Sequence, residues 1–583
     1  MRATVAARVG DDQPDFRLER PPLVGTIGPR RAKCRSAGTK GSRVWRAPDR
    51  LEPDREGTPV RRAVFAAVAA ATLASLVAAP AAGAAPAAPA PAAYTPPPVA
   101  WGPCDNAGLQ AAGAQCGFVT VPLDYQNPGG AKAQLAVSRI KHKTPDSQYQ
   151  GVMLTNPGGP GGSGLTLARV GGNVPNHAGD AYDWIGFDPR GVGSSKPALS
   201  CDNGYTSFDR PSYVPLTPQL EKTWLDRAKN YAADCAKKNP KALLDNLKTT
   251  DTVRDMDSIR AALGAEQINF YGYSYGTYLG QVYGTMFPQR VRRMVLDSTV
   301  DPRNVWYQAN LNQDVAFDRN INIWFGWLAK YDSTYHLGKT QAAVKATVDR
   351  ELVKLSLKPA GGQIGPDELT DVIQQASYYQ LTWLGVADAL SALVTKGDPS
   401  QVKALFESDS DNGYAVYLGV QCTDVQWPTN WNQWRVDNWK TFLKAPYFTW
   451  QNAWFNAPCV FWPAKAGKPV QVDGKGVKSV LMIDETLDAA TPYEGSLEVR
   501  SRFPGASLIA EPGGTSHAIT PRGNACVDTK IADYLATGAL PARKPGRTAD
   551  VECAPLPQPQ PAPSAPAAQE QAKARSLPLV GHL

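Results

Sequence analysis

Gly272-Tyr273-Ser274-Tyr275-Gly276 is the stretch that decides the fold of this chain, because of what lies on either side of it. Residues 267–271 form a short apolar run typical of a buried strand, and residues 277–287 have apolar side chains at helical spacing. A strand, a tight turn around a serine and a helix together make a nucleophile elbow. The glycines leave room in the turn, and a helix N-terminus favours negative charge developing at Ser274. The pentapeptide alone occurs by chance in many proteins, so the prediction rests on this context.

The chain from residue 101 to about 302 alternates predicted strands with turns and helices. Apolar or alternating runs predict strands at residues 134–140, 152–155, 184–187 and 293–297, and helical spacing predicts an amphipathic helix at 252–263. Such alternation is typical of an α/β fold, in which a mostly parallel sheet has helices on both faces.

Residues 303–465 have a different character, with long helical patterns and eleven of the fifteen tryptophans. Strands return at residues 477–483 and 506–510. The simplest arrangement is one α/β core, built from residues 101–302 and 466–553, with residues 303–465 inserted before the last strands as a helical cap. We call residues 303–465 the cap segment. A separate second domain is the weaker alternative, because the sheet would then lack its last strands.

The first 85 residues are expected to be a polar N-terminal extension followed by a secretory signal peptide. Arg61-Arg62 precedes an uncharged apolar run at 63–79, and Ala82-Gly83-Ala84 supplies a small-residue cleavage site near Ala84. The alternative is a membrane anchor, but this alanine-rich run is short for a spanning helix. We therefore expect a secreted, extracellular protein. Residues 86–100 are predicted to be a linker and residues 554–583 a disordered tail.

The net charge of the chain does not indicate a polyanionic partner. Residues 1–62 hold 15 Lys and Arg against 8 Asp and Glu, so they account for +7 of the net +8. The remainder is nearly neutral. We expect no nucleic-acid binding and no stable membrane association.

The cysteines indicate disulfides and give no sign of a metal or other cofactor. Eight of the nine follow the expected cleavage site, and no C-x-x-C pair or Cys/His cluster is present. An even number in an exported chain favours disulfides, although eight cysteines allow 105 pairings. Our expectation pairs sequential neighbours, namely 104–116, 201–235, 422–459 and 526–553.

A nucleophilic serine needs a base, and the base needs an acid that orients it. In α/β-hydrolases these groups follow the serine in the order acid, then histidine. Of the five histidines, three precede or interrupt this order and His582 lies in the expected tail, which leaves His517, in a loop directly after a predicted strand. For the acid, Asp488 is preferred because it lies a few residues beyond a predicted strand end. Asp484 is the second candidate, and Glu485 and Glu494 are also available.

Acyl transfer also needs donors for the oxyanion. The glycine-rich run at residues 156–164 follows the predicted strand at 152–155. We assign the donors to the backbone N–H groups of Gly159 and Tyr275. A phosphate-binding loop is the alternative, but the run lacks the Lys and Ser/Thr of a P-loop.

Together these motifs resemble the α/β-hydrolase exopeptidases that include proline iminopeptidase, and most closely the secreted tripeptidyl aminopeptidases of actinobacteria. The resemblance covers residues 100 to 553 approximately. It rests on residues 156–161, Asp188-Pro189-Arg190-Gly191-Val192-Gly193, the 272–276 elbow, Asp488 with Thr491-Pro492, and His517. One departure is Ala518, where many relatives have glycine. The resemblance implies an α/β-hydrolase fold and hydrolysis of peptide substrates from their free N-termini.

An aminopeptidase must also recognise an α-ammonium group. Residues 419–424 look like the family's segment of a cysteine followed by an acid, which makes Asp424 the candidate for this role. A carboxylesterase or lipase with the same triad is an alternative, and a non-catalytic binding protein on a hydrolase scaffold is a more remote one. The number of residues released, the preference for peptide over ester and the oligomeric state stay open.

Overall fold

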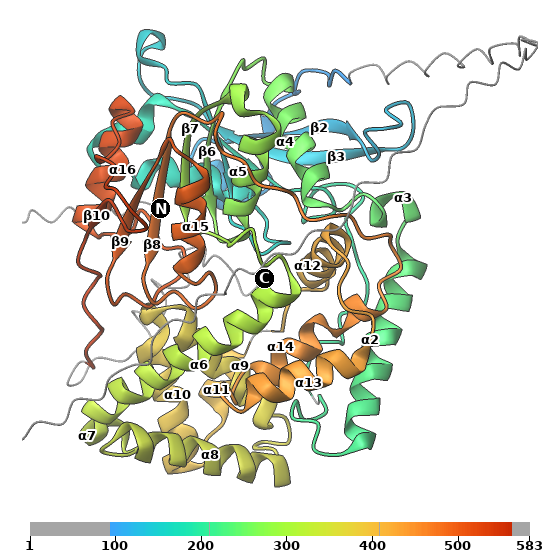
Figure 1. Cartoon of the computed structure of the whole chain (residues 1–583), viewed down its shortest axis with the longest axis vertical. Helices are drawn as coiled ribbons and strands as arrows, with labels where there is room; N and C mark the ends of the chain where they lie inside the picture. The colour runs from blue at the N-terminus through green and yellow to red at the C-terminus, as the bar shows by residue number, and fades with distance from the viewer. Residues whose placement is uncertain (1–93, 209, 407, 562–583) are drawn as a thin grey trace, which may run out of the picture. The chain divides into compact units, whose positions relative to one another are not determined.

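The strands around the elbow form one ten-stranded sheet in the computed structural model, which describes residues 94–561 except 209 and 407 (Figure 1). The strands are β1 (Gly102–Pro103), β2 (Gln115–Pro122), β3 (Lys132–Ile140), β4 (Val152–Asn156), β5 (Asp183–Phe187), β6 (Ile268–Tyr273), β7 (Val291–Asp297), β8 (Val480–Glu485), β9 (Ala506–Glu511) and β10 (Val551–Glu552). Their order is β1-β2-β3-β5-β4-β6-β7-β8-β9-β10. Strands β1, β2, β3 and β5 pair antiparallel, and every pair from β5–β4 to β9–β10 is parallel. The predicted α/β fold with a mostly parallel sheet is confirmed.

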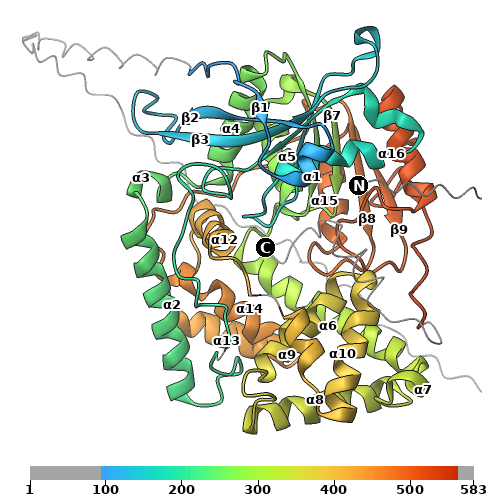
Figure 2. The same cartoon turned by 180° about the vertical axis from the view of Figure 1, so that it is seen from behind.

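Side chains alternate across this sheet and so supply two cores. On β7, Met294 and Leu296 belong to one buried cluster, while Val295 between them belongs to another. The first cluster includes α4 (Thr249–Ala262), α5 (Tyr275–Met286) and α15 (Glu494–Arg502), and the second includes α16 (Ala525–Thr537). Figure 2 shows α16 and α1 (Ala107–Ala111) from behind. Helices therefore cover both faces, as a parallel sheet requires.

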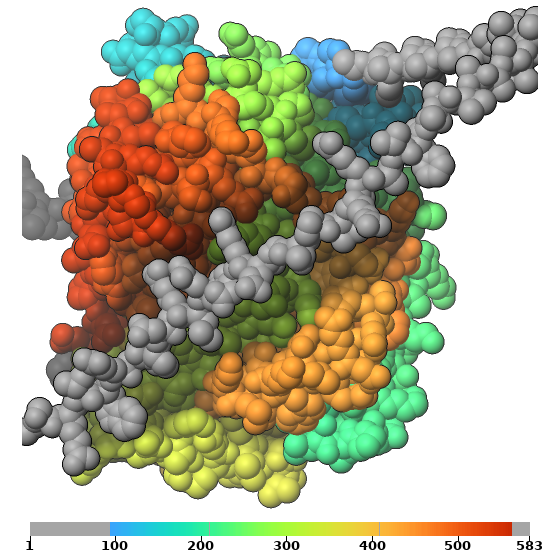
Figure 3. All heavy atoms as spheres, viewed as in Figure 1, coloured from blue at the N-terminus to red at the C-terminus, as the bar shows by residue number. Residues whose placement is uncertain are grey.

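The chain between β7 and β8 adds no strand to this sheet among the described residues. It contains α6 (Tyr307–Lys330), α7 (Asp332–Tyr335), α8 (Gln341–Leu357), α9 (Pro366–Tyr378), α10 (Trp383–Lys396), α11 (Ser400–Leu405), α12 (Asp411–Asp424), α13 (Trp431–Phe442) and α14 (Thr449–Asn456). Helices α6, α8, α9 and α10 bury an apolar cluster of their own. Figure 3 shows yellow and orange parts of this segment below the red C-terminal part of the core. The expected insertion of helices before the last strands is thus present.

One further helix joins the cap segment from outside it. Helix α2 (Pro218–Lys238) follows β5 in the chain, together with the short α3 (Lys241–Leu244). Trp224 of α2 stacks on Trp454 of α14, with ring centroids 5.5 Å apart and planes at 8°. The stretch expected to be purely core, residues 101–302, therefore also contributes to the helical layer.

Four disulfides pair sequential neighbours as expected: Cys104–Cys116, Cys201–Cys235, Cys422–Cys459 and Cys526–Cys553. The expected signal peptide, the linker up to residue 93 and the tail from residue 562 lie outside the described residues. Residues 554–561, which were expected in that tail, are described, and the Trp327 indole donates to the Pro559 carbonyl over 2.9 Å. None of the helices within residues 94–561 is long and apolar enough to span a bilayer.

Candidate active site

The sheet brings the candidate residues together because they follow the carboxyl ends of adjacent parallel strands. The glycine-rich run follows β4, Ser274 follows β6, Asp488 follows β8 and His517 follows β9. Strands β4, β6, β7, β8 and β9 are neighbours in that order. In open α/β sheets this edge is where ligands bind.

Ser274 lies in a strained turn between β6 and α5. Its backbone has φ +53° and ψ −126°, a conformation that L-residues rarely adopt. A Cβ on Gly272 would lie 2.6 Å from the Gly276 carbonyl oxygen, and one on Gly276 would lie 2.6 Å from the Asn156 carbonyl oxygen. Both glycines are thus required by close backbone approach, and the geometry matches the predicted elbow.

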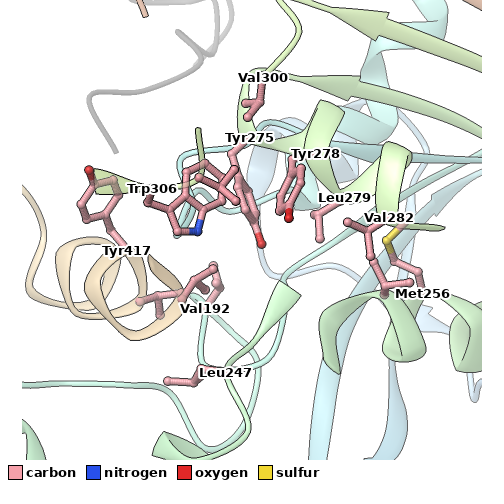
Figure 4. Close-up of a cluster of buried hydrophobic side chains, with 14 of the residues drawn as sticks. Val192, Leu247, Met256, Tyr275, Tyr278, Leu279, Val282, Val300, Trp306 and Tyr417 are labelled. Carbon is pink, nitrogen blue, oxygen red and sulfur yellow. The ribbon is translucent and has the colours of Figure 1, made fainter. Parts of the chain in front are cut away.

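The helix after the elbow is fixed by the core beneath it. Tyr275, Tyr278, Leu279 and Val282 of α5 are buried, and their rings and methyl groups face the apolar cluster in Figure 4. Trp306 packs edge-on against Tyr278, with ring centroids 5.2 Å apart. This packing holds the N-terminus of α5, and hence Ser274, against the sheet.

His517 and Asp488 form a buried hydrogen-bonded pair. His517 Nδ1 lies 2.7 Å from Asp488 Oδ2, and both side chains are almost fully buried. The other Asp488 oxygen accepts from the backbone N–H groups of Ala490 at 2.8 Å and Thr491 at 3.0 Å, and the Thr491 hydroxyl donates to Oδ2 over 3.0 Å. Burial raises the pKa of Asp488. The charge of His517 and its hydrogen bond to Asp488 lower this pKa by more, so the pKa lies below its usual value.

Asp484, the second candidate for the acid, has a different environment. Its Oδ2 accepts from the Ser496 hydroxyl at 2.5 Å, and the side chain is fully buried. Burial, reinforced by repulsion from Asp488, raises the pKa of Asp484 well above its ordinary value. Burial and the nearby charge of Asp488 thus disfavour the ionised form of Asp484, whereas pairing with His517 favours the ionised form of Asp488.

Ser274, His517, Gly159 and Tyr275 all line one cavity of about 790 Å³. The glycine-rich run approaches the elbow closely, because a Cβ on Gly158 would lie only 2.8 Å from the Tyr275 backbone nitrogen. Gly158 and Gly159 have φ values of +93° and +104°, which favour glycine. The two assigned oxyanion donors thus belong to adjoining segments on the wall that holds Ser274.

The structure does not bring Asp424 into this cavity. Its carboxylate accepts from the backbone N–H of Thr249 at 2.6 Å, from the Thr249 hydroxyl at 2.6 Å and from the Trp306 indole at 3.0 Å. Asp424 thereby caps the first turn of α4 and is absent from the cavity lining. The candidate role for Asp424 in binding the substrate N-terminus is therefore withdrawn, since its oxygens are occupied by protein donors.

Other carboxylates line the cavity instead, and the sequence analysis missed them. They are Asp301, Asp371, Asp409 and Glu494. The signal for Asp371 lies in α9, where Asp371, Gln374, Gln375 and Tyr378 recur at helical spacing and are half-buried, while Val372, Ile373, Ala376 and Ser377 are fully buried. A polar stripe on an otherwise buried helix indicates that this side of the helix faces a cavity. Asp409 follows α11, and no periodicity marks it.

Comparison with known proteins places these features in a family. Residues 445–553 match the family described as TAP-like protein. The chain is 43% identical over 456 residues to a tripeptidyl aminopeptidase of Streptomyces coelicolor, covering 76% of this chain and 83% of the relative. It is 31% identical over 473 residues to the serine protease Hip1 of Mycobacterium bovis, covering 76% and 90%. It is also 31% identical over 495 residues to carboxylesterase B of Mycobacterium tuberculosis, covering 79% and 90%.

Proposed function

The chain belongs to the family of α/β-hydrolase exopeptidases that includes the tripeptidyl aminopeptidases, and from this premise we propose that it is a secreted serine peptidase that releases tripeptides from free N-termini. The observation that supports this proposal most is the shared cavity, in which Ser274 and the Asp488-bound His517 face the same space. That the protein is a serine hydrolase follows from the family. The triad, the acyl-enzyme, secretion, cleavage from the free N-terminus and the length of the released product are the proposed parts.

The proposed reaction uses Ser274, Asp488 and His517 as a triad. As Ser274 Oγ attacks the scissile carbonyl carbon, its proton passes to Nε2 of His517, while Asp488 holds the Nδ1 proton and stabilises the imidazolium. The N–H groups of Gly159 and Tyr275 donate to the oxyanion. The C–N bond then breaks, and His517 returns the proton to the leaving amine.

Hydrolysis of the acyl-enzyme completes the cycle. Water attacks the ester carbonyl and gives a proton to His517, which then protonates Ser274 Oγ as the C–O bond breaks. The peptide acid leaves and the free enzyme is restored. Each of these steps uses groups of this chain and water alone.

The experiment that tests the triad is labelling with a serine-directed fluorophosphonate, followed by rates with alanyl tripeptide p-nitroanilide. Wild-type enzyme should be labelled and active, while Ser274→Ala should lose the label and at least about 10³-fold in kcat. Labelling that survives in Ser274→Ala would refute Ser274 as the nucleophile. Absence of labelling in the wild type would favour a non-catalytic binding protein.

A second candidate function is ester hydrolysis, favoured by the similarity to carboxylesterase B. Esters and amides are cleaved by the same triad, so the chemistry of Ser274 does not separate them. Parallel rates with short-chain p-nitrophenyl esters and with peptidyl p-nitroanilides do separate them. Activity confined to the esters would replace the peptidase proposal.

Secretion is supported by the four disulfides, which form and persist in oxidising compartments. N-terminal sequencing of protein recovered from culture medium should begin near Ala85. Recovery of the uncleaved chain from the cytosol would contradict this part of the proposal.

A further inference from the structure

Asp297 and Ser298, at the end of β7, contact all three segments that carry the candidate triad. Strand β7 lies between β6 and β8 in the sheet. The Asp297 carbonyl accepts from the Ser274 backbone N–H at 3.0 Å, and the Ser298 N–H donates to the Ile483 carbonyl of β8 at 2.9 Å. Ser298 Oγ accepts from the N–H of Ala518, the residue directly after the base, at 2.7 Å. Two adjacent residues thus bond to the turn of the nucleophile, to the strand that precedes the acid and to the loop of the histidine.

The Asp297 side chain holds the loop that carries His517. Its Oδ2 accepts from the Thr520 N–H at 2.9 Å and from the Thr520 hydroxyl at 2.6 Å. Two tyrosines of β6 hold the same threonine, since the Tyr273 hydroxyl donates to the Thr520 carbonyl at 2.7 Å and the Tyr271 hydroxyl lies 2.8 Å from Thr520 Oγ1. All four of these side chains are buried. The base is therefore fixed from its C-terminal side as well as by its bond to the acid.

The backbone at these contacts has a conformation that is unfavourable for residues other than glycine. Ser298 has φ +62° and Ala518 has φ +49°, and the two residues are hydrogen-bonded to each other. Such strain persists where surrounding contacts over-determine the backbone, and it is concentrated at active sites. Neither Asp297 nor Ser298 is among the described residues that line the cavity, so contact with substrate does not account for the arrangement. What these contacts fix is the position of His517.

Asp297 is close enough to the triad to interact with its charges. Burial raises the pKa of Asp297 to about 6; its hydrogen bonds from Thr520 and the charge of His517 oppose this effect, and repulsion from Asp488 adds to it. Asp297 therefore becomes ionised as the pH rises through about 6. Burial also raises the pKa of each tyrosine beside Asp297, so their hydroxyls are neutral in this range. The remaining groups that interact with Asp297 are the carboxylates Asp484, Glu485 and Glu511 and the tyrosines Tyr271, Tyr273 and Tyr379.

We propose that Asp297 and Ser298 are positioning residues of the triad, which hold the loop of His517 so that Nε2 is aimed at Ser274. This inference rests on the proposed triad. Ser298 acts through the Ala518 N–H, and the Asp297 carboxylate acts through Thr520. Hydrogen bonds to a charged acceptor are about twice as strong as bonds to a neutral one, so the hold on Thr520 weakens when Asp297 is protonated. Because neither residue contacts substrate, its loss should lower kcat and leave KM unchanged.

Ser298→Gly tests the hydroxyl without adding strain, because glycine readily adopts a positive φ. The Ala518 N–H loses its acceptor, and kcat per labelled Ser274 should fall at least about tenfold at an unchanged KM. Ser507→Ala is the matched control, since it removes a buried hydroxyl from the neighbouring strand β9, and that hydroxyl bonds to no residue in the described part of the chain. Its kcat should equal that of the wild type.

Asp297→Asn tests the charge in a side chain of nearly the same shape, and it gives an independent result if Ser298→Gly folds poorly. At about pH 8 its kcat should fall at least about fivefold, because the bonds from Thr520 then have a neutral acceptor. The wild-type carboxyl is itself protonated at low pH, so the ratio of wild-type to variant kcat should approach one as the pH falls through about 6. The loss in Ser298→Gly should not depend on pH in this way.

The outcomes separate this inference from the peptidase proposal. Rates are measured with an alanyl tripeptide p-nitroanilide, with p-nitrophenyl acetate and as the rate of fluorophosphonate labelling of Ser274, and circular dichroism checks folding. If both variants keep the kcat of Ser507→Ala, or if the loss in Asp297→Asn is the same at every pH, the inference is overturned. If the wild type is labelled but cleaves only the ester, the peptidase proposal fails, and the ester and labelling rates decide the role of Asp297 and Ser298. A wild type that is not labelled overturns both.

Discussion

Replacing Asp488 by asparagine should abolish most activity, while the same replacement at Asp484 should not. The two aspartates are four residues apart and both are fully buried. They differ in their partners, since Asp488 binds His517 Nδ1 and Asp484 binds the Ser496 hydroxyl. Comparing the two variants therefore separates the loss of the triad hydrogen bond from the general effect of placing an amide in a buried position.

The size of the effect at Asp488 follows from its hydrogen bonds. Its Oδ1 is held by the N–H groups of Ala490 and Thr491, so an asparagine keeps its carbonyl oxygen there and presents its NH₂ to His517. Two N–H donors cannot face one another, and the imidazole must carry its proton on Nε2. That tautomer cannot accept the proton of Ser274. Changes of this kind lower kcat by about 10⁴-fold, which is about 5.5 kcal/mol at 1.36 kcal/mol per factor of ten.

Asp484→Asn should leave kcat/KM within about fivefold of wild type, because one neutral hydrogen bond is worth about 1 kcal/mol and a factor of ten is about 1.36 kcal/mol. Burial, followed by repulsion from Asp488, raises the pKa of Asp484 and so disfavours its carboxylate form, and the substitution places a neutral group of similar shape there. The Ser496 hydroxyl can still donate to the amide oxygen.

The assay is initial rates with a tripeptidyl p-nitroanilide, normalised to the fraction of enzyme labelled at Ser274 under prolonged exposure. Circular dichroism shows whether each variant is folded. The reasoning is refuted if Asp488→Asn keeps more than about a tenth of the activity, a loss far below the expected factor. Equal losses in both variants would also refute it, because the loss would then reflect a buried amide in general and not the triad.

Two further predictions concern the cavity. Asp409 lines the cavity that holds Ser274, and burial, followed by repulsion from Asp371, raises its pKa to about 7 against the opposing effect of Arg210. Asp409 therefore gains a negative charge as the pH rises through about 7, while a free peptide keeps its α-ammonium charge up to about pH 8. KM for free tripeptides should thus be lowest between these values, and Asp409→Asn should flatten the acid side of a KM–pH profile. Gly158→Ala should lower fluorophosphonate labelling of the folded protein at least about tenfold, because its Cβ would lie 2.6 Å from a backbone oxygen of the elbow strand, whereas Gly129→Ala, with open space around it, should label normally.

Much of the core and of the candidate triad could be predicted from the sequence because each rests on local signals. Apolar runs of five or six residues identify buried strands, and the strained serine turn needs glycines at two fixed positions. His517 was found by elimination, because few histidines exist and the order of the triad in the chain is restrictive. Asp488 and Asp484 could be ranked but not separated. Their pKa values depend on partners that lie near them only in the folded chain.

The cavity wall could not be predicted, for physical reasons that Asp424 illustrates. A buried carboxylate near a helix end can bind a ligand or cap another helix, and the sequence is the same in both cases. Asp424 caps α4 across 175 residues of chain. Likewise, α2 joins the cap segment through Trp224, which nothing in its local pattern indicates. Which polar groups face a cavity is decided by long-range packing of this kind.

The contacts of α9 link the cavity lining to the chemistry. The helix holds the His517 backbone N–H through the Tyr378 carbonyl, and Asp371, Gln374 and Gln375 of the same helix line the cavity. A substrate that contacts this part of the lining therefore stabilises the same helix position that orients the base. Binding energy from this remote part of the substrate is then expressed in the transition state as well as in the ground state. It follows that shortening a peptide substrate until it no longer contacts α9 should lower kcat together with raising KM, because α9, and the base attached to it, are then less firmly held in the reactive geometry.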